Sequence, residues 1–222
     1  MAGTCSGDHD HVEQRQEPDR WRLGLNYGYF WSELTFDGET DADIDRRGAT
    51  ATIERRLTER ATLQLAAGGV FGGHLDVLGA RYQLGPGWLA AVSFSYAALE
   101  GSDDLPFVMI SVSGGVSGAR TEEQVRPGAP EGERETLTAI DARVGLVVGK
   151  TLWNTLSPYL GVRAFGGPVL WHARGEDRSG TDQHHYQVAA GLLATLPRGF
   201  DLYAELAPLG ERAVAVGGGF AF

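Results

Sequence analysis

The 222-residue chain is poor in cysteine, in basic residues and in long apolar runs. Its single cysteine, Cys5, excludes an intramolecular disulfide. Lysine and arginine number 19 against 29 aspartates and glutamates, and the net charge of -10 argues against nucleic-acid binding, which needs a basic face. No apolar run approaches the roughly 18 residues of a membrane helix, so a membrane crossing would have to use strands.

The beginning of the chain also lacks the apolar core of a secretory signal, so we expect a signal peptide to be absent from this sequence. Residues 1–19 are polar and predict a flexible tail, followed by a single domain over residues 20–222. Ala2-Gly3-Thr4-Cys5 faintly resembles the end of a lipoprotein signal, which leaves a lipidated Cys5 and a free thiol both open. We expect no metal and no cofactor, since no zinc pattern, phosphate loop or nucleophile elbow is present.

What the chain has in abundance is period-2 alternation, which is typical of strands with two different faces. The odd positions from Trp21 to Trp31 are all apolar or aromatic, while the opposite face carries Arg22, Gly24, Asn26 and Gly28. Ten residues at about 3.3 Å rise and a tilt near 40° span roughly 25 Å, the height of the apolar band of a membrane barrel. Tryptophans favour the two edges of such a band, and we predict Trp21, Trp31, Trp88 and Phe222 as interface aromatics.

The last eleven residues carry a resemblance to a known family. Val214, Val216, Phe220 and Phe222 share one face of a strand, and Gly217, Phe220 and Phe222 form a Gly-x-x-apolar-x-aromatic ending. This ending resembles the closing strand of bacterial outer-membrane β-barrels. The resemblance implies an outer-membrane location, contact with outer-membrane lipid, and recognition of Phe220 and Phe222 by the barrel-assembly machinery.

The pattern as a whole predicts an all-β fold, a closed antiparallel up-and-down transmembrane β-barrel of about ten strands, and a monomer. An even number keeps both chain ends on one side of the membrane. Gly166-Gly167-Pro168 predicts a bulge, because proline cannot donate to the ladder. We expect long polar loops at 37–46, 73–87, 121–135 and 173–183, and short connections at 58–60, 101–106 and 197–199.

Inside such a barrel six charged residues would face the lumen: Arg22, Glu54, Asp141, Arg143, Arg163 and Glu205. Unpaired charges there are costly, so we expect ion pairs. The pairs could plug the lumen of a surface structural or interaction protein, or they could gate a narrow solute channel. If the apolar faces pointed inward and the polar faces outward, the same strands would form a soluble β-barrel binding protein. Alternation alone does not decide between these two arrangements.

An enzyme is the remaining alternative. Asp182-x-His184 resembles the Asp-x-His pair of omptins, the ten-stranded outer-membrane proteases, and Asp41-x-Asp43 could serve as their second pair. The resemblance implies a water activated by a histidine whose basicity a carboxylate tunes. A plain polar rim is the competing interpretation of these four residues, and the sequence favours a protein that is not an enzyme.

Overall fold

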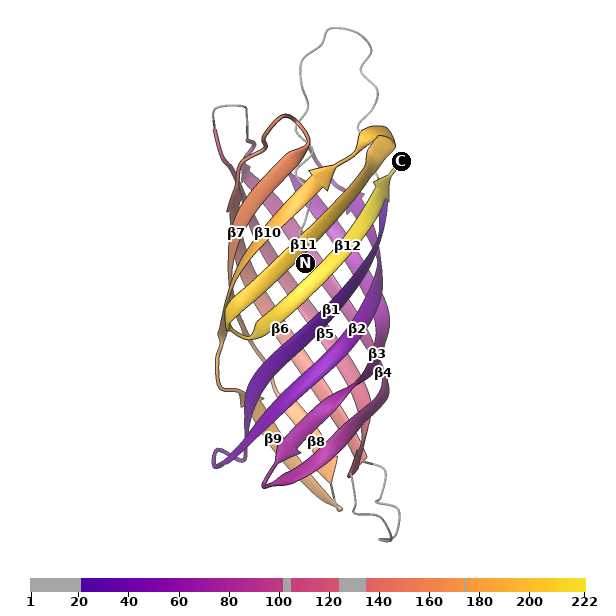
Figure 1. Cartoon of the computed structure of the whole chain (residues 1–222), viewed down its shortest axis with the longest axis vertical. Coiled ribbons are helices and arrows are strands. Elements are labelled where there is room, and N and C mark those ends of the chain that lie inside the picture. The colour runs from indigo at the N-terminus through magenta and orange to yellow at the C-terminus, as the bar shows by residue number, and fades with distance from the viewer. Residues whose placement is uncertain (1–20, 102–104, 124–134, 174) are drawn as a thin grey trace, which may run out of the picture.

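The computed structural model describes residues 21–101, 105–123, 135–173 and 175–222, and strands dominate these ranges (Figure 1). Trp21 and Phe222 exchange backbone hydrogen bonds of 3.3 and 2.9 Å, so both lie at one end of the molecule, called the terminal end below. The other end is called the distal end. The elements are β1 (Trp21–Phe36), β2 (Thr40–Arg56), β3 (Ala61–Val77), β4 (Ala80–Leu99), β5 (Phe107–Glu123), β6 (Glu135–Gly149), β7 (Leu156–Gly166), β8 (Val169–Ala173), β9 (Glu176–Asp182), β10 (Tyr186–Thr195), η1 (Pro197–Gly199), β11 (Phe200–Gly210) and β12 (Arg212–Ala221).

Ten strand crossings close into an antiparallel barrel, as the sequence predicts. β7 and β8 form one crossing, because both pair with β6 and only residues 167–168 separate them, where the expected bulge lies. β9 and β10 likewise form one crossing, interrupted at residues 183–185. The pairing of β12 with β1 closes the sheet through the register Arg22↔Ala221 to Trp31↔Arg212.

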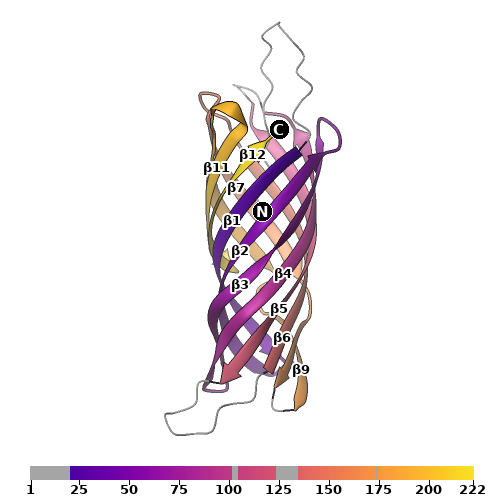
Figure 2. The same ribbon diagram turned by 90° about the vertical axis from the view of Figure 1, so that its right-hand side faces the viewer.

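The described strands form two stacked rings that share β1 to β6. At the terminal end the ring is completed by β7, β10, β11 and β12. The β11–β12 turn ends partway along the wall, and beyond it β8 and β9 complete the ring, since β9 pairs with β1 from Leu34 to Phe36. Figures 1 and 2 show β9 at the distal end, beyond the β10 to β12 part of the wall. The wall therefore narrows from ten strands to eight.

In the wider ring the apolar side chains face outward. Leu25 is 70% exposed, and Leu160 on the opposite part of the wall is 65% exposed. The inward positions carry mainly small, polar and charged residues, together with a buried cluster of Phe107, Met109, Tyr159 and Leu193. This arrangement suits a lipid exterior, and closure leaves the wider ring without an open strand edge, which lipid could not hydrate.

In the narrower distal ring the polarity of the two faces is inverted. On β1 the outward residue Glu33 is exposed, while Leu34 and Phe36 point inward and are 2% and 0% exposed. A contiguous apolar cluster fills the inside of this ring: Leu34, Phe36, Ala42, Ile44, Leu75, Val77, Tyr82, Leu84, Leu137, Val169 and Trp171. The distal ring is thus built like a water-soluble barrel around a packed core.

Three of the expected long loops are wrong. β2 begins at Thr40, β3 and β4 meet at a two-residue turn of Leu78 and Gly79, and β9 occupies most of 173–183. The acidic residues of 37–46 suggest a solvated loop, yet they alternate with Ala42 and Ile44, which enter the distal core. For the expected loop at 121–135, β5 and β6 extend to Glu123 and from Glu135, and 124–134 lie outside the described residues. The connection at 101–106 is described except for 102–104, and the turns at 58–60 and 197–199 are short.

Among the described residues no helix has the length and apolar character needed to span a membrane. The expected tail at residues 1–19, with Cys5, lies outside the described residues.

Candidate functional site in the barrel lumen

Arg22 lies in the lumen near the terminal end and has two acidic partners. Its Nε donates to Asp201 at 2.8 Å, a second guanidinium nitrogen donates to the other Asp201 oxygen, and its Nη1 lies 3.6 Å from Glu54 Oε2. The side chain fits because Gly219 on β12 leaves room, where an added Cβ would come within 2.6 Å of the Arg22 guanidinium. Gln64 also donates to Glu54 at 3.3 Å.

Arg163 forms the most buried ion pair. Its two terminal nitrogens donate to the two oxygens of Glu205 at 2.7 Å each, a bidentate arrangement. Tyr159 donates to Glu205 at 3.0 Å, and Arg163 also donates to Gln187 at 2.6 Å. The side chains of Arg163 and Glu205 are 9% and 7% exposed, so the pair is almost fully removed from solvent.

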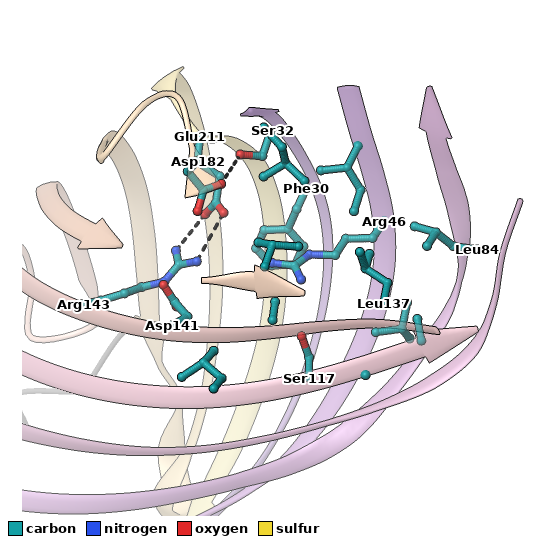
Figure 3. Close-up of a pocket in the computed structure, with 18 residues that line it drawn as sticks. Phe30, Ser32, Arg46, Leu84, Ser117, Leu137, Asp141, Arg143, Asp182 and Glu211 are labelled. Carbon is teal, nitrogen blue, oxygen red and sulfur yellow. Dashed lines mark hydrogen bonds and ion pairs between the residues drawn. The ribbon is translucent and has the colours of Figure 1, made fainter. Parts of the chain in front are cut away.

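Arg143 reaches across the lumen from β6 to the β11–β12 turn. It donates to Glu211 at 2.7 and 3.2 Å and to Asp141 at 2.5 Å, and Figure 3 shows these groups pointing toward one another. Gln187 donates to the backbone carbonyl of Glu211 at 3.0 Å. The turn that ends the wider ring is therefore held in place by a side chain from the opposite wall.

All six expected lumen charges thus face inward. Two of their partners, Asp201 and Glu211, were not predicted from the sequence. Asp201 has the same parity as Tyr203 and Glu205, so alternation along β11 could have identified it. Glu211 lies in a tight turn outside the strand periods, and no sequence pattern points to it. Arg22, Arg143 and Arg163 each have their own carboxylate partners, and Gln187 links Arg163 to Glu211, the partner of Arg143.

A cavity of about 250 Å³ lies between these groups. One side of it is lined by the charged residues of β1, β6, β7 and β11, and Arg46 of β2 also lines it. The other side is lined by neutral polar side chains from β2 to β5: Thr50, Thr52, Gln64, Ser93, Ser111 and Ser113. A second space of about 50 Å³ adjoins it toward the distal end and is lined by Ser32, Asp141, Arg143, Asp182 and Glu211 among others.

Apolar clusters lie at both ends of this cavity. The distal cluster includes Phe36 and Trp171, whose rings pack 5.5 Å apart, and the Trp171 indole donates to Thr121 at 3.2 Å. The cluster nearer the terminal end consists of Phe107, Met109, Tyr159 and Leu193, with Val147 and Tyr203 packed against it. The distal cluster draws its residues from β1 to β4, β6 and β8 and so extends across the narrower ring.

The four enzyme candidates lie near each other but do not form the two pairs that an omptin-like site would need. Asp182 faces inward, where its carboxylate accepts a hydrogen bond from Ser32 at 2.6 Å. His184 lies beyond the end of β9, and its Nε2 is 3.5 Å from Glu33 on the outer face. Burial raises the pKa of Asp182 above its ordinary value. The break between β9 and β10 separates the two residues, although their spacing in sequence suggests a common face.

Asp41 and Asp43 are both exposed on β2. Asp41 accepts hydrogen bonds from Gln183 at 2.7 Å and from Thr35 at 3.3 Å, and Asp43 is opposite Glu33 in the register. No cluster of three or more histidine, cysteine or acidic residues suited to a metal ion occurs in the described ranges.

The predicted interface aromatics lie on the outer face. Arg55 lies over the Trp21 ring at 5.2 Å, and Trp31 is opposite Arg212 in the register. Phe222 stacks on Phe220 at the terminal end, and an added Cβ at Gly118 would come within 2.9 Å of the Trp88 ring.

The comparisons with known proteins concern the fold. No protein-family model and no curated protein matches the chain. Among solved structures it is similar to the outer membrane protease OmpT of Escherichia coli, with 12% identity, 95% of this chain and 99% of that chain covered, and a TM-score of 0.57. The chain has the fold of an outer-membrane β-barrel. It is also similar to the translocator domain of the autotransporter NalP from Neisseria meningitidis, with 13% identity, coverage of 94% and 90%, and a TM-score of 0.52. At these identities the similarity establishes the barrel and leaves the activity open.

Proposed function

We propose that this chain is a monomeric integral protein of the bacterial outer membrane with a plugged lumen, acting as a surface structural or interaction protein. The outward apolar band of the wider ring supports membrane insertion. Phe222 and Trp21 would then lie at the periplasmic side, and the distal ring would project from the cell surface. The chain would contact outer-membrane lipid, and Phe220 and Phe222 would be read by the barrel-assembly machinery.

The apolar cluster across the distal ring is the main support for the proposal of a plugged lumen. Phe36 and Leu75 are 0% exposed and Trp171 is 3% exposed, so these side chains pack out of reach of water. Fully burying a large apolar side chain contributes about 1.5–3 kcal/mol, so opening the cluster would expose several such contributions at once. A narrow solute channel would need this cluster to part, and the ion pairs of Arg143 and Arg163 to rearrange.

The membrane placement is tested by heat-modifiability on a gel after refolding into detergent micelles, with membrane fractionation of cells beside it. We expect the unheated protein to migrate faster than the heated one and to fractionate with the outer membrane. Solubility without detergent and identical migration would mean that the apolar faces form a soluble core, as in the soluble binding-protein alternative.

The plugged lumen is tested by conductance in planar bilayers. We expect the wild-type protein to be silent and the double variant Phe36→Ala/Trp171→Ala to conduct, because it empties the centre of the distal cluster. Arg143→Ala alone should stay silent, since it leaves that cluster intact. Steady conductance of the wild-type protein, raised by Arg143→Ala, would instead support the gated-channel alternative.

The protease alternative is favoured by the likeness to OmpT in fold, but the geometry gives it little support because Asp182 and His184 have different partners. It predicts a peptidase activity that His184→Ala abolishes. We expect folded wild-type protein to show no peptidase activity above that of the His184→Ala variant. A wild-type activity lost in that variant would reinstate the enzyme.

A further inference from the structure

Arg47 and Arg212 are two exposed arginines on the outer face of the barrel. In the lumen, Arg22, Arg143 and Arg163 are ion-paired with carboxylates, whereas Arg46 lies over the Phe30 ring at 5.8 Å. In the part of the chain that the structure describes, Arg47 and Arg212 have no ion pair, and both are exposed. A guanidinium that is always charged and faces outward without a carboxylate is free to bind an anion.

These two arginines flank one pair of aromatic rings. Arg47 is opposite Tyr29 on the β2 side of β1, and Arg212 is opposite Trp31 on the β12 side. Their Cα atoms are about 12 Å apart, because two strand spacings and two residues of rise separate them. At this distance the two side chains can reach one headgroup placed between them. The Arg47 guanidinium lies 5.3 Å from the Tyr29 ring centre, and the Tyr29 and Trp31 rings meet edge to face at 4.0 Å.

The acidic groups nearest to the arginines already have partners. Asp45, opposite Trp31, accepts a hydrogen bond from Tyr29 at 3.0 Å and lies 3.4 Å from His74 Nδ1. Glu33, the next outward residue along β1, lies 3.5 Å from His184. In these contacts neither carboxylate forms an ion pair with Arg47 or Arg212.

The position of these residues along the barrel suggests what they bind. On the terminal side of them the outer face is apolar, with Tyr27, Val214 and Val216 between 43% and 47% exposed. On the distal side the outer face is polar and acidic, in a chain whose net charge is -10. The arginines therefore lie at the boundary between an apolar band and a water-facing surface, where the headgroup of a lipid would meet the protein.

We propose that Tyr29, Trp31, Arg47 and Arg212, called the arginine patch, bind the phosphate of a phosphorylated lipid in the membrane leaflet nearest the distal ring. The two guanidinium groups donate to the phosphate oxygens, and the acyl chains lie along Tyr27, Val214 and Val216. The proposal rests on the membrane placement proposed above. A free phosphate would use the arginines but not the apolar band beneath them.

The test uses native mass spectrometry of the full chain, folded in neutral detergent micelles, with phosphatidic acid as the probe. We expect one lipid to bind the wild-type protein, and Arg47→Gln and Arg212→Gln each to weaken binding about 10-fold, because each removes charge-assisted hydrogen bonds. Arg81→Gln is the matched control, since Arg81 is also exposed on the outer face but is ion-paired with Asp76 at 2.7 Å. Arg81→Gln should leave the affinity unchanged.

Two further probes distinguish the sources of the ligand. Diacylglycerol, which has the acyl chains without the phosphate, should not bind at the patch, and excess inorganic phosphate should not displace phosphatidic acid. Equal binding of diacylglycerol, or displacement by inorganic phosphate, would overturn the proposal. So would a double variant Arg47→Gln/Arg212→Gln that is folded and heat-modifiable yet binds phosphatidic acid like the wild type; that result would leave the membrane placement intact. A protein that stays soluble without detergent would remove the membrane placement itself.

Discussion

At the scale of single residues, glycines decide where large side chains can enter the lumen. A Cβ added at Gly191 would lie 2.2 Å from the Tyr159 ring, and one at Gly217 would lie 2.5 Å from the Tyr203 ring. Each glycine faces inward and removes the volume that its partner occupies. At these two positions glycine thus makes room for a large side chain in a narrow barrel.

The ion pair between Arg163 and Glu205 should matter more to stability than any exposed pair. We expect Arg163→Met to lower the free energy of unfolding by about 3 kcal/mol, because it leaves a buried carboxylate without its cation. The control Arg81→Met removes an exposed pair and should cost less than about 1 kcal/mol. Urea unfolding in micelles, followed by tryptophan fluorescence, measures both. Equal effects of the two variants would contradict a dry, structural role for the lumen pair.

Asp182, on β9 in the distal ring, should give stability a pH dependence of its own. Burial raises its pKa in the folded state above the unfolded value of about 3.9, so ionisation opposes folding. The contribution is absent below about pH 3.9 and destabilises increasingly as the pH rises through the folded pKa. Asp182→Asn should therefore gain stability relative to the wild type over this window, as measured by urea midpoints.

Asp76 serves as a control because its pKa is shifted in the opposite direction, downward. The hydrogen bond from Arg81 lowers the pKa of Asp76, so its contribution is present above about pH 3.9 and is lost as the pH falls through the folded pKa. The pair is exposed, and the effect should be small. If Asp182→Asn and the wild type showed parallel pH profiles, the carboxyl of Asp182 would be hydrated in the folded protein.

At the scale of elements, each of the longest strands serves two environments. β1 presents apolar residues outward as far as Trp31 and then inward at Leu34 and Phe36, without a change in its period. The wall changes instead through the β11–β12 turn, where β12 ends its pairing with β1 and β9 takes over. The position of that turn sets the border between the two rings.

Gly210, at the start of the β11–β12 turn, should tolerate no side chain. Its φ is +74°, and an added Cβ would come within 1.8 Å of the Tyr186 carbonyl oxygen. A Cβ added at Gly38, whose φ is +75°, would have no atom within 4 Å. Gly38→Ala therefore measures the cost of the left-handed backbone alone. We expect Gly38→Ala to cost about 1 kcal/mol, and Gly210→Ala to cost about 1–3 kcal/mol more, by urea unfolding. Similar losses in both variants would mean that the turn can shift freely.

At the scale of the whole molecule, the closing pair of β1 and β12 joins residues about 200 positions apart in the chain. Folding therefore depends on bringing the two ends together, and the proposed recognition of the last strand by assembly machinery would serve that step. Phe222 packs against Phe220, and Phe220 packs against Phe200 at 4.8 Å.

A role of Phe222 in assembly and a role in packing predict different results for the same variant. We expect Phe222→Ala to lower the amount of folded protein in the outer membrane of cells while leaving refolding into micelles nearly unchanged. Phe200→Ala is the control, because Phe200 and Phe222 are 50% and 53% exposed at the same end of the barrel. A loss of similar size in both variants, in cells and in micelles, would assign Phe222 to packing alone.

The sequence by itself determined the features that depend on local periodicity. The strands of the wider ring, their inward and outward faces and the break near 166–168 follow from alternation and turn residues. The count of ten also needed the rule that such barrels have an even number of strands. Alternation is a property of neighbouring residues, and the two faces of a strand keep their identity wherever the strand lies.

Only the tertiary structure decided which face meets a core and where the rings change. Asp41, Asp43 and Asp45 alternate with Ala42 and Ile44, but the acidic residues suggest a loop until the apolar cluster of the distal ring is seen. The spacing of Asp182 and His184 suggests one face, yet the interruption between β9 and β10 gives them different partners. Glu211 meets Arg143 across the lumen, between strands far apart in the chain. Burial and long-range pairing depend on the closed wall, and no local pattern encodes which distant strand completes it.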